Sequence, residues 1–415
     1  VAEALEAEVD YISVMVGNNN RLEARTRHWP PAPARPGLFR GVVRTVKKYV
    51  SAVPVAGVGR ILTMDLAEDI VASGDADMVG MVRAQIADPE LLPLSKAGRA
   101  TEVRPCIGAN VCVNSLIERR PLRCLINPDV AESTDLDQAQ PLDGTSAVVV
   151  GGGPAGLEAA RRLAVRGAAV TLFEQRKRLG GRMAQWADAP TRREAHKWIQ
   201  WLERQLRDRG ADLQLGVRVD PARIASLRPD HLVIATGAED APVSVPSDGS
   251  VDVLTPWKAL EPGVVSGRAV VFDAIGDLDG ALIADYLHGR DAEVVLVTSR
   301  LHVGEGEGIN TLVPMLKHLA EARIAMHERF RPVRIAHGEV ELAGVLGGPS
   351  RRLRADVLIT WAGGTPNTEL ARDLRQRGLA PLLIGDALRP RRVVDATADA
   401  KRVTDPLRPS LTQVI

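Results

Sequence analysis

Cysteine and aromatic residues are scarce in this chain, which has three cysteines and 3% aromatic residues among 415. So few cysteines exclude the disulfide framework that stabilises small secreted proteins, and they fit the reducing cytoplasm. Charge of one sign is also missing, because 53 lysines and arginines balance 52 aspartates and glutamates. Without a strong field, nothing attracts nucleic acid or an anionic membrane surface. We therefore expect a cytoplasmic protein whose partners are neither nucleic acids nor membranes.

Long hydrophobic runs are absent as well. No apolar segment reaches the roughly 18 residues that a membrane-spanning helix requires, and the acidic start of the chain does not resemble a signal peptide. The composition, with 45% hydrophobic and 25% charged residues, is typical of a soluble globular protein, and the length predicts about two or three domains. Because the chain opens on Val1 and a helix-like segment that runs into a strand, we expect it to begin in the middle of a domain.

The most informative motif is AVVVGGGPAG at 147–156, where an apolar strand pattern runs into a glycine turn and then into a helical pattern. Gly151 allows the tight turn, Gly153 leaves room for a pyrophosphate, and Gly156 lets helix and strand pack closely. Free N–H groups at the helix N-terminus attract phosphates. A second apolar run ends at Glu174, which can accept hydrogen bonds from an adenosine ribose. The order predicts a dinucleotide or ADP site; the alternative is a glycine-rich turn in an ordinary α/β domain.

Strand and helix patterns alternate over residues 1–100, as in the last portion of a barrel of parallel strands. A loop-rich segment (104–130) holds all three cysteines, and a polar linker follows it. After the first nucleotide-binding unit (147–237), a second βαβ pattern occupies 267–299, and the strand patterns near the end of the chain return to the first unit. The sequence therefore predicts an α/β protein.

The second βαβ unit departs from the nucleotide-binding pattern. Asp273 stands at the position of the first glycine, although Gly276 and Gly280 remain. A carboxylate at the turn would repel a pyrophosphate. If NAD(P)H does bind, Ser299 and Arg300 at the next strand end would suit a 2′-phosphate. We favour a structural vestige over an NAD(P)H site.

Taken together, these motifs resemble the trimethylamine dehydrogenase / 2,4-dienoyl-CoA reductase family, in which an Old Yellow Enzyme-like barrel is fused to FAD/NAD(P)-binding domains. The matching segments are GVGRI (57–61), ADMVGMVRAQIADPEL (76–91), RPCIGANVC (104–112), LRCLINP (122–128), GGGPAGLEAA (151–160), LGGRM (179–183), IATG (234–237) and IGDA (384–387). The resemblance implies the C-terminal part of a TIM barrel, an iron–sulfur-type loop segment and two Rossmann-like nucleotide-binding domains. About five of the eight barrel strands have no counterpart in this chain.

On this resemblance we divide the chain into five ranges. They are a partial FMN-binding TIM barrel (1–103), an iron–sulfur-type segment (104–130), the first part of an FAD/ADP-binding domain (143–265), an inserted NAD(P)-binding-like domain (266–353) and the second part of the FAD/ADP-binding domain (354–415).

The resemblance places FMN at the C-terminal end of the barrel, with its phosphate at Gly59 and Arg60 and at Val82 and Arg83. The glycine would allow backbone approach, and an arginine would pair with phosphate oxygens. The alternative is a strand-end turn with solvated arginines. The family's catalytic positions do not carry over, so the catalytic residues stay unknown.

The cysteine segment matches three of the four cluster ligands of the family: Cys106, Cys112 and Cys124 are present, and Ala109 replaces the second cysteine. Thiolates suit iron, whereas alanine cannot ligate it. The options are a [4Fe–4S] cluster with one iron held by water or another ligand such as Asn110, a [3Fe–4S] cluster, or no cluster. Three small buried hydrophobic residues are the bland alternative.

Further residues support the first nucleotide site. The resemblance implies FAD in the reductase branch and ADP in the amine-dehydrogenase branch, and we favour FAD because LGGRM and IGDA are both present. Asp386 would contact the ribityl or pyrophosphate region, or serve as a helix N-cap. The predicted cofactor-binding residues at this site are Gly151, Gly153, Ala155, Gly156, Glu174, Gly181, Gly237 and Asp386.

The leading functional hypothesis is a flavin-dependent oxidoreductase that passes electrons between a barrel flavin, an iron–sulfur cluster and a second cofactor. Its substrates would be methylated amines, or unsaturated thioesters and related enones. The alternatives are an FAD-dependent NAD(P)H reductase module and a structural ADP/FAD-binding subunit. Expected partners are a small-molecule substrate and either an electron-transfer protein or a subunit that completes the barrel.

Overall fold

A computed structural model describes residues 1–18, 20–130 and 140–405 of the chain. The chain divides into two compact units. Within the described residues, the first unit comprises 1–130 and 308–314, and the second comprises 140–307 and 315–405.

The first unit is built around three short parallel strands in the order β1-β2-β3. Ile12 of β1 lies opposite Val55 of β2, and Ala56 lies opposite Met78 of β3. A helix follows each of the first two strands, as parallel strands require. The elements are α1 (Ala2–Leu5), β1 (Ile12–Val14), α2 (Leu22–His28), α3 (Arg40–Tyr49), β2 (Val55–Gly57), α4 (Met64–Ala72), β3 (Met78–Val79), α5 (Val82–Ala87), α6 (Leu91–Lys96) and α7 (Val111–Ile117).

Apolar packing and one buried carboxylate hold this unit together. Val43 of α3 and Ile70 of α4 pack on the sheet in one cluster with Val55. Asp75 is buried and accepts hydrogen bonds from Arg40 and Arg44 on α3. These two guanidinium groups lower the pKa of the Asp75 carboxyl well below its usual range, because they favour its charged form.

The second unit contains a parallel sheet with the strand order β18-β7-β4-β5-β6. Because β4 comes first along the chain and lies in the middle, the order reverses there, and ligands of such sheets bind beyond the carboxyl ends of the strands at this point. The elements around this sheet are β4 (Ser146–Val150), α8 (Pro154–Val165), β5 (Ala169–Glu174), α9 (Gly181–Trp186), α10 (Ala195–Asp208), β6 (Asp212–Leu215), α11 (Pro221–Leu227), β7 (His231–Ile234), α15 (Glu369–Gln376), β18 (Leu382–Leu383) and α16 (Val393–Thr404).

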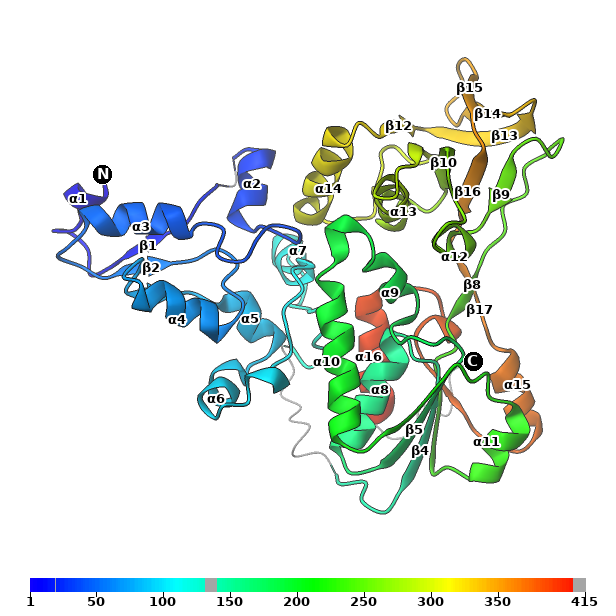
Figure 1. Cartoon of the computed structure of the whole chain (residues 1–415), viewed down its shortest axis with the longest axis horizontal. Helices are drawn as coiled ribbons and strands as arrows, with labels where there is room; N and C mark the ends of the chain where they lie inside the picture. Colours follow the sequence, from blue (N-terminus) through cyan, green and yellow to red (C-terminus); the bar gives the residue numbers. More distant parts are fainter. Residues whose placement is uncertain (19, 131–139, 406–415) are drawn as a thin grey trace. The chain divides into compact units, whose positions relative to one another are not determined.

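Helices cover both faces of this sheet (Figure 1). Side chains of a strand alternate between its faces, so Val148 and Val150 of β4 pack in one cluster with Ile224 of α11 and Leu374 of α15. Helix α8 contacts β4 and β5 and packs between α10 and α16. A strand that is buried on both faces reads as a continuous apolar run, which explains the AVVV pattern before the glycine turn.

The second unit holds another parallel sheet in the order β12-β11-β10-β16-β9, and an antiparallel sheet β13-β14-β15. The elements here are β9 (Asp252–Leu254), α12 (Pro256–Ala259), β10 (Arg268–Asp273), α13 (Asp279–His288), β11 (Glu293–Thr298), β12 (Ala325–Glu328), β13 (Phe330–Ala336), β14 (Glu339–Gly344), β15 (Arg351–Arg354) and β16 (Val357–Trp361), together with the part of α14 (Ile309–Glu321) that follows residue 314. The pair β8 (Ala238–Asp240) and β17 (Gly364–Pro366) is antiparallel.

The predicted α/β class and the two nucleotide-binding folds are confirmed. The sequence did not indicate α2, because its residues are mostly polar and show no apolar periodicity. It also did not indicate the antiparallel sheet. Strands β9 and β16 belong to the second parallel sheet although they lie outside the predicted range 266–353. Among the helices that the structure describes, none has the length and apolar character to cross a membrane.

Candidate functional site

The glycine turn at 151–156 follows β4 directly and opens α8. Two of its glycines are required by packing. A Cβ on Gly151, whose φ is +110°, would lie 2.2 Å from the carbonyl oxygen of Ala235. A Cβ on Gly156 would lie 1.9 Å from the carbonyl oxygen of Gly151. Larger side chains at either position would push the helix away from the strands.

Gly153 differs from these two because it faces open space. Its backbone is extended, with φ −78° and ψ −179°, and no heavy atom lies within 4 Å of the position of a Cβ. The twelve residues of α8 start at the next residue, Pro154. An open glycine at the N-terminus of a long helix is the cradle that a pyrophosphate group fits, since its oxygens can reach free backbone N–H groups.

Glu174 lies at the end of β5 and is buried beside the turn. Its Oε2 accepts a hydrogen bond of 2.7 Å from the backbone N–H of Gly152, and its Oε1 accepts one of 2.7 Å from that of Arg176. An ionised carboxylate has about four acceptor positions, so Glu174 can support the turn and still accept from ribose hydroxyls.

We expect Glu174→Ala to weaken the affinity for ADP by about tenfold to a hundredfold, because a carboxylate–hydroxyl hydrogen bond contributes about 1.5–3 kcal/mol. Glu174→Gln keeps an oxygen that can accept from Gly152, so it separates support of the turn from ribose binding. Calorimetric titration of nucleotide-free protein with ADP measures both variants. An affinity unchanged in Glu174→Ala would remove this residue from the site.

The structure brings two more of the predicted segments to the turn. A Cβ on Gly181 would lie 3.1 Å from the Cα of Gly153, and a Cβ on Gly385 would lie 2.8 Å from the Cβ of Ala155. Asp386 follows and accepts a hydrogen bond of 3.0 Å from the backbone N–H of Arg391, which is a loop contact rather than a helix N-cap. Burial raises its pKa.

Gly237 lies after β7, where its carbonyl accepts a hydrogen bond of 3.0 Å from the backbone N–H of Asn367. No heavy atom lies within 4 Å of the position of its Cβ. Like Gly153, Gly237 therefore has open space at the position of a side chain.

Arg182 is a residue of this region that the sequence did not single out. It pairs with the buried Asp240, and its guanidinium carbon lies 4.7 Å and 5.0 Å from the ring centroids of Trp257 and Trp361. Its charge acts on Asp386 and favours the ionised carboxylate. Trp186 is a third tryptophan near this arginine, so three of the six tryptophans of the chain lie around it. The scarcity of tryptophan was the one signal in the sequence that could have drawn attention to this region.

The predicted FMN residues lie in the first unit beside the cysteine segment. Arg60 is buried, and a Cβ on Gly108 would lie 3.0 Å from its Nη1. Arg83 donates a hydrogen bond of 2.7 Å from Nη1 to the Oδ1 of Asn110. The Nδ2 of Asn110 in turn donates a hydrogen bond of 2.8 Å to the carbonyl of Trp29, so contacts within the first unit fix this amide.

The other two predicted FMN residues differ in exposure. Phe39 covers Gly59, because a Cβ on this glycine would lie 2.5 Å from the Phe39 ring. Val82 starts α5 and is 68% exposed. The four residues Gly59, Arg60, Val82 and Arg83 thus do not form one open cradle like that at Gly153.

The three cysteines lie close enough for their charges to interact. Burial, followed by the charges of Cys124 and Cys106, raises the pKa of Cys112 to about 12. Burial also raises the pKa of Cys124. Within the described residues, no three His, Cys, Asp or Glu side chains gather tightly enough for a single metal ion.

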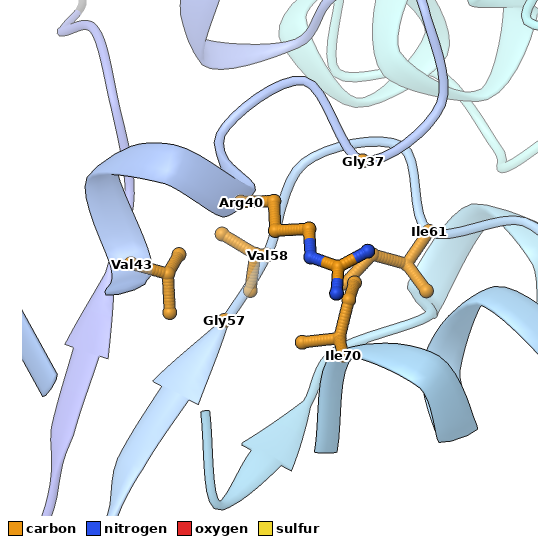
Figure 2. Close-up of a pocket in the computed structure, with 7 residues that line it drawn as sticks. All are labelled: Gly37, Arg40, Val43, Gly57, Val58, Ile61 and Ile70. Carbon is orange, nitrogen blue, oxygen red and sulfur yellow. The ribbon is translucent and has the colours of Figure 1, made fainter. Parts of the chain in front are cut away.

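Figure 2 shows the residues that line a shallow hollow in the first unit, which is too narrow to enclose a water molecule. Val43, Val58 and Ile70 contribute apolar side chains to its lining. Its one charged lining side chain, Arg40, donates to Ser73 as well as to Asp75. Since that guanidinium is engaged in contacts within the unit, the hollow offers no charged group for a phosphate.

Asp273 ends β10 and is fully buried, at 0% exposure. Its Oδ1 accepts hydrogen bonds of 2.9 Å from the backbone N–H groups of Ile275 and Gly276. In the described part of the chain, its Oδ2 has no hydrogen-bond partner. Burial raises the pKa of this carboxyl from 3.8 to about 7.

This raised pKa predicts a dependence of stability on pH. Between pH 3.8 and about 7 the folded protein keeps a proton that the unfolded chain has lost, so this group lowers the stability as the pH rises through that window. Asp273→Asn removes the effect. We expect the melting temperature of the variant, relative to the wild type, to increase from about pH 5 to about pH 8. A difference that does not change with pH would contradict the raised pKa.

Comparisons with known proteins agree with this architecture. Residues 145–381 match the family described as Pyridine nucleotide-disulphide oxidoreductase, and residues 10–102 match the NADH:flavin oxidoreductase / NADH oxidase family. The first match covers the unit with the glycine turn, and the second covers the parallel strands of the first unit. The chain therefore belongs to the pyridine nucleotide-disulphide oxidoreductases, and the two matches together are those of the trimethylamine dehydrogenase-like family of flavin-dependent oxidoreductases.

Individual relatives support the same family. The chain is 36% identical over 309 residues to N,N-dimethylglycine/sarcosine dehydrogenase of Chromohalobacter salexigens, which covers 72% of this chain and 44% of that protein. It is 32% identical over 370 residues to NADH oxidase of Thermoanaerobacter brockii, covering 86% and 56%. Histamine dehydrogenase from Rhizobium sp. 4-9 superimposes with a TM-score of 0.89 at 26% identity, covering all of this chain and 63% of the other. The chain thus spans about half the length of its curated relatives.

Proposed function

We propose that this chain is the electron-transfer part of a flavin-dependent oxidoreductase, with an adenine nucleotide, FAD or ADP, at the glycine turn of the second unit. The observation that carries the proposal is the open face of Gly153 at the start of α8, with Glu174 hydrogen-bonded to the turn and Gly385, the residue before Asp386, against Ala155. FAD, when bound, would supply a two-electron carrier that can also exchange single electrons.

The residues of the chain have separate roles in this proposal. The backbone at Gly153 and the N-terminus of α8 would hold the pyrophosphate, and Glu174 would orient the ribose. Gly151 and Gly156 keep the turn tight. Asp386, whose pKa is raised by burial, lies next to this turn and can form a hydrogen bond either as an acid or as a carboxylate.

An iron–sulfur cluster in the first unit is the second part of the proposal. Cys106, Cys112 and Cys124 would supply three thiolates, and Ala109 leaves the fourth ligand position without a side-chain donor. Hydrogen bonds to Arg83 and to the carbonyl of Trp29 hold the Asn110 amide in place, and we propose no ligand role for it. We therefore propose a [3Fe–4S] cluster, or a [4Fe–4S] cluster with one iron that carries a non-protein ligand.

Methylated amines are the substrate class that we propose first, because N,N-dimethylglycine/sarcosine dehydrogenase is among the similar proteins. The alternative is a nucleotide-binding subunit that serves a partner. The sheet of only three strands described in the first unit would suit this alternative, because a partner could supply further strands. FMN would belong to the complete barrel, at Gly59, Arg60, Val82 and Arg83.

Anaerobic absorption spectroscopy tests the proposed function. We expect the purified protein to show flavin bands and a broad iron–sulfur shoulder, and both to bleach when sarcosine or dimethylamine is added to the protein together with any partner that completes the barrel. A colourless protein that still binds ADP would favour the structural subunit. A protein that neither absorbs nor binds ADP would overturn both functions.

A further inference from the structure

We propose that the buried carboxyl group of Asp273 occupies the phosphate-binding amides of the second nucleotide turn and thereby excludes NAD(P)H from this domain. The inference rests on the proposed function, because it states that the proposed oxidoreductase does not use NAD(P)H as an electron carrier in this domain. Its structural basis lies wholly in the second unit and does not depend on the first nucleotide site.

The two turns of the second unit differ in what faces their amides. In the first, residues 151–153 join β4 to α8; the amide of Gly152 donates to Glu174, but the space at Gly153 is open. In the second, residues 274–278 join β10 to α13, and the amides of Ile275 and Gly276 donate to the carboxylate of Asp273. Backbone N–H groups of such a turn are the donors that a pyrophosphate uses. Here a side chain of the protein already satisfies them.

The other side of the second turn is also covered. Arg300 donates a hydrogen bond of 3.2 Å from Nε to the carbonyl of Ala274, and a Cβ on Gly276 would lie 2.5 Å from its Cγ. The backbone N–H of Gly306 donates to the carbonyl of Gly276 at 2.8 Å. Arg300, which would suit a 2′-phosphate, therefore packs against the turn itself. The loop that contains Gly306 is also hydrogen-bonded to the turn.

Two further carboxylates lie at the start of α13. Asp277 follows Gly276, and its Oδ1 accepts hydrogen bonds of 2.9 Å from the backbone N–H of Asp279 and 3.1 Å from the Nε1 of Trp361. Burial raises the pKa of both aspartates. The charges of Arg182 and Arg392 act in the opposite direction. The N-terminus of α13, which would otherwise be free for a phosphate, thus lies beside buried acid groups of the protein itself.

Direct titration with NADH and NADPH tests the proposal in the wild type, Asp273→Ala and Asp273→Asn. Nicotinamide fluorescence reports binding without any need for bound flavin. We expect no saturable binding below about 1 mM to the wild type. Asp273→Asn keeps an oxygen that accepts from both amides and should behave like the wild type. Asp273→Ala frees the amides, and we expect its affinity to rise at least tenfold.

Two results would overturn the proposal. One is saturable binding of NADH or NADPH to the wild type that persists when the first turn is blocked by Gly153→Val. The other is a folded Asp273→Ala variant, verified by its circular dichroism, that binds no better than the wild type. The adenine nucleotide released from the same samples reports on the proposed function separately, because failure there concerns the first turn alone.

Discussion

Replacing Gly153 with valine should abolish binding of the adenine nucleotide while leaving the fold intact. No heavy atom lies within 4 Å of the position of the new Cβ, and the extended backbone at this residue is open to any side chain. The valine would instead occupy the space that a pyrophosphate needs. Loss of two hydrogen bonds to a charged group, at about 1.5–3 kcal/mol each, corresponds to about a hundredfold weaker affinity or more.

A matched control exists in the first unit. Gly41 on α3 is also open, with no heavy atom within 4 Å of its Cβ position. Gly41→Val should leave the nucleotide content unchanged, whereas Gly153→Val should lose the bound nucleotide. We expect Gly153→Val to lower the free energy of unfolding by about 1 kcal/mol, because valine is a poorer N-cap of α8. Calorimetry with ADP and thermal melts distinguish these effects. Unaltered ADP affinity in Gly153→Val would place the nucleotide elsewhere.

Substitution of Cys112 by alanine should remove iron from the first unit. With Ala109 already in the family's second ligand position, two thiols would remain within the described segment, which is too few to hold a cluster. We expect iron and acid-labile sulfide to fall to background and the visible shoulder to disappear. Thermal melts show whether the loss of the buried side chain has unfolded the unit.

The reciprocal variant, Ala109→Cys, supplies the missing ligand. We expect it to bind a [4Fe–4S] cluster with four cysteines, so that the ratio of iron to protein rises and the electron paramagnetic resonance signal changes from that of the wild type. Ala109→Ser is the matched control, because it adds a side chain without a thiolate. Equal iron content in the wild type and in Cys112→Ala would refute a cluster at these cysteines.

The first nucleotide turn could be predicted from sequence because its demands are local. Gly151 and Gly156 are needed where a Cβ would collide with the backbone, and such positions follow the strand–turn–helix order directly. The approach of Gly385 to Ala155 depends on the return of the chain to the first sheet. Only the resemblance to a known family could anticipate that juxtaposition.

Contacts that join distant segments were not predictable in this way. The environment of Arg182 combines Asp240, Trp257 and Trp361, and nothing in their spacing links them. Likewise, Asn110 was considered as an iron ligand, but its oxygen accepts from Arg83, which is 27 residues away. A side chain's partner depends on the packing of whole elements, which apolar periodicity does not specify.

The sequence predicts a poor phosphate site at Asp273, but it does not reveal the contacts of this carboxyl group. A carboxylate at a glycine position predicts a poor phosphate site from charge alone. The structure adds that the same carboxylate bonds the amides of its own turn. This arrangement depends on the longer connection between β10 and α13, whose exact path the sequence pattern does not reveal.

The measurement that tests the account most directly is chromatography of the nucleotide released when the purified protein is denatured. The account predicts one adenine-containing nucleotide, FAD or ADP, for each chain, retained in Asp273→Ala and lost in Gly153→Val. A wild-type protein that releases no adenine nucleotide and takes up none from solution would contradict the central claim that the glycine turn at 151–156 is a nucleotide site.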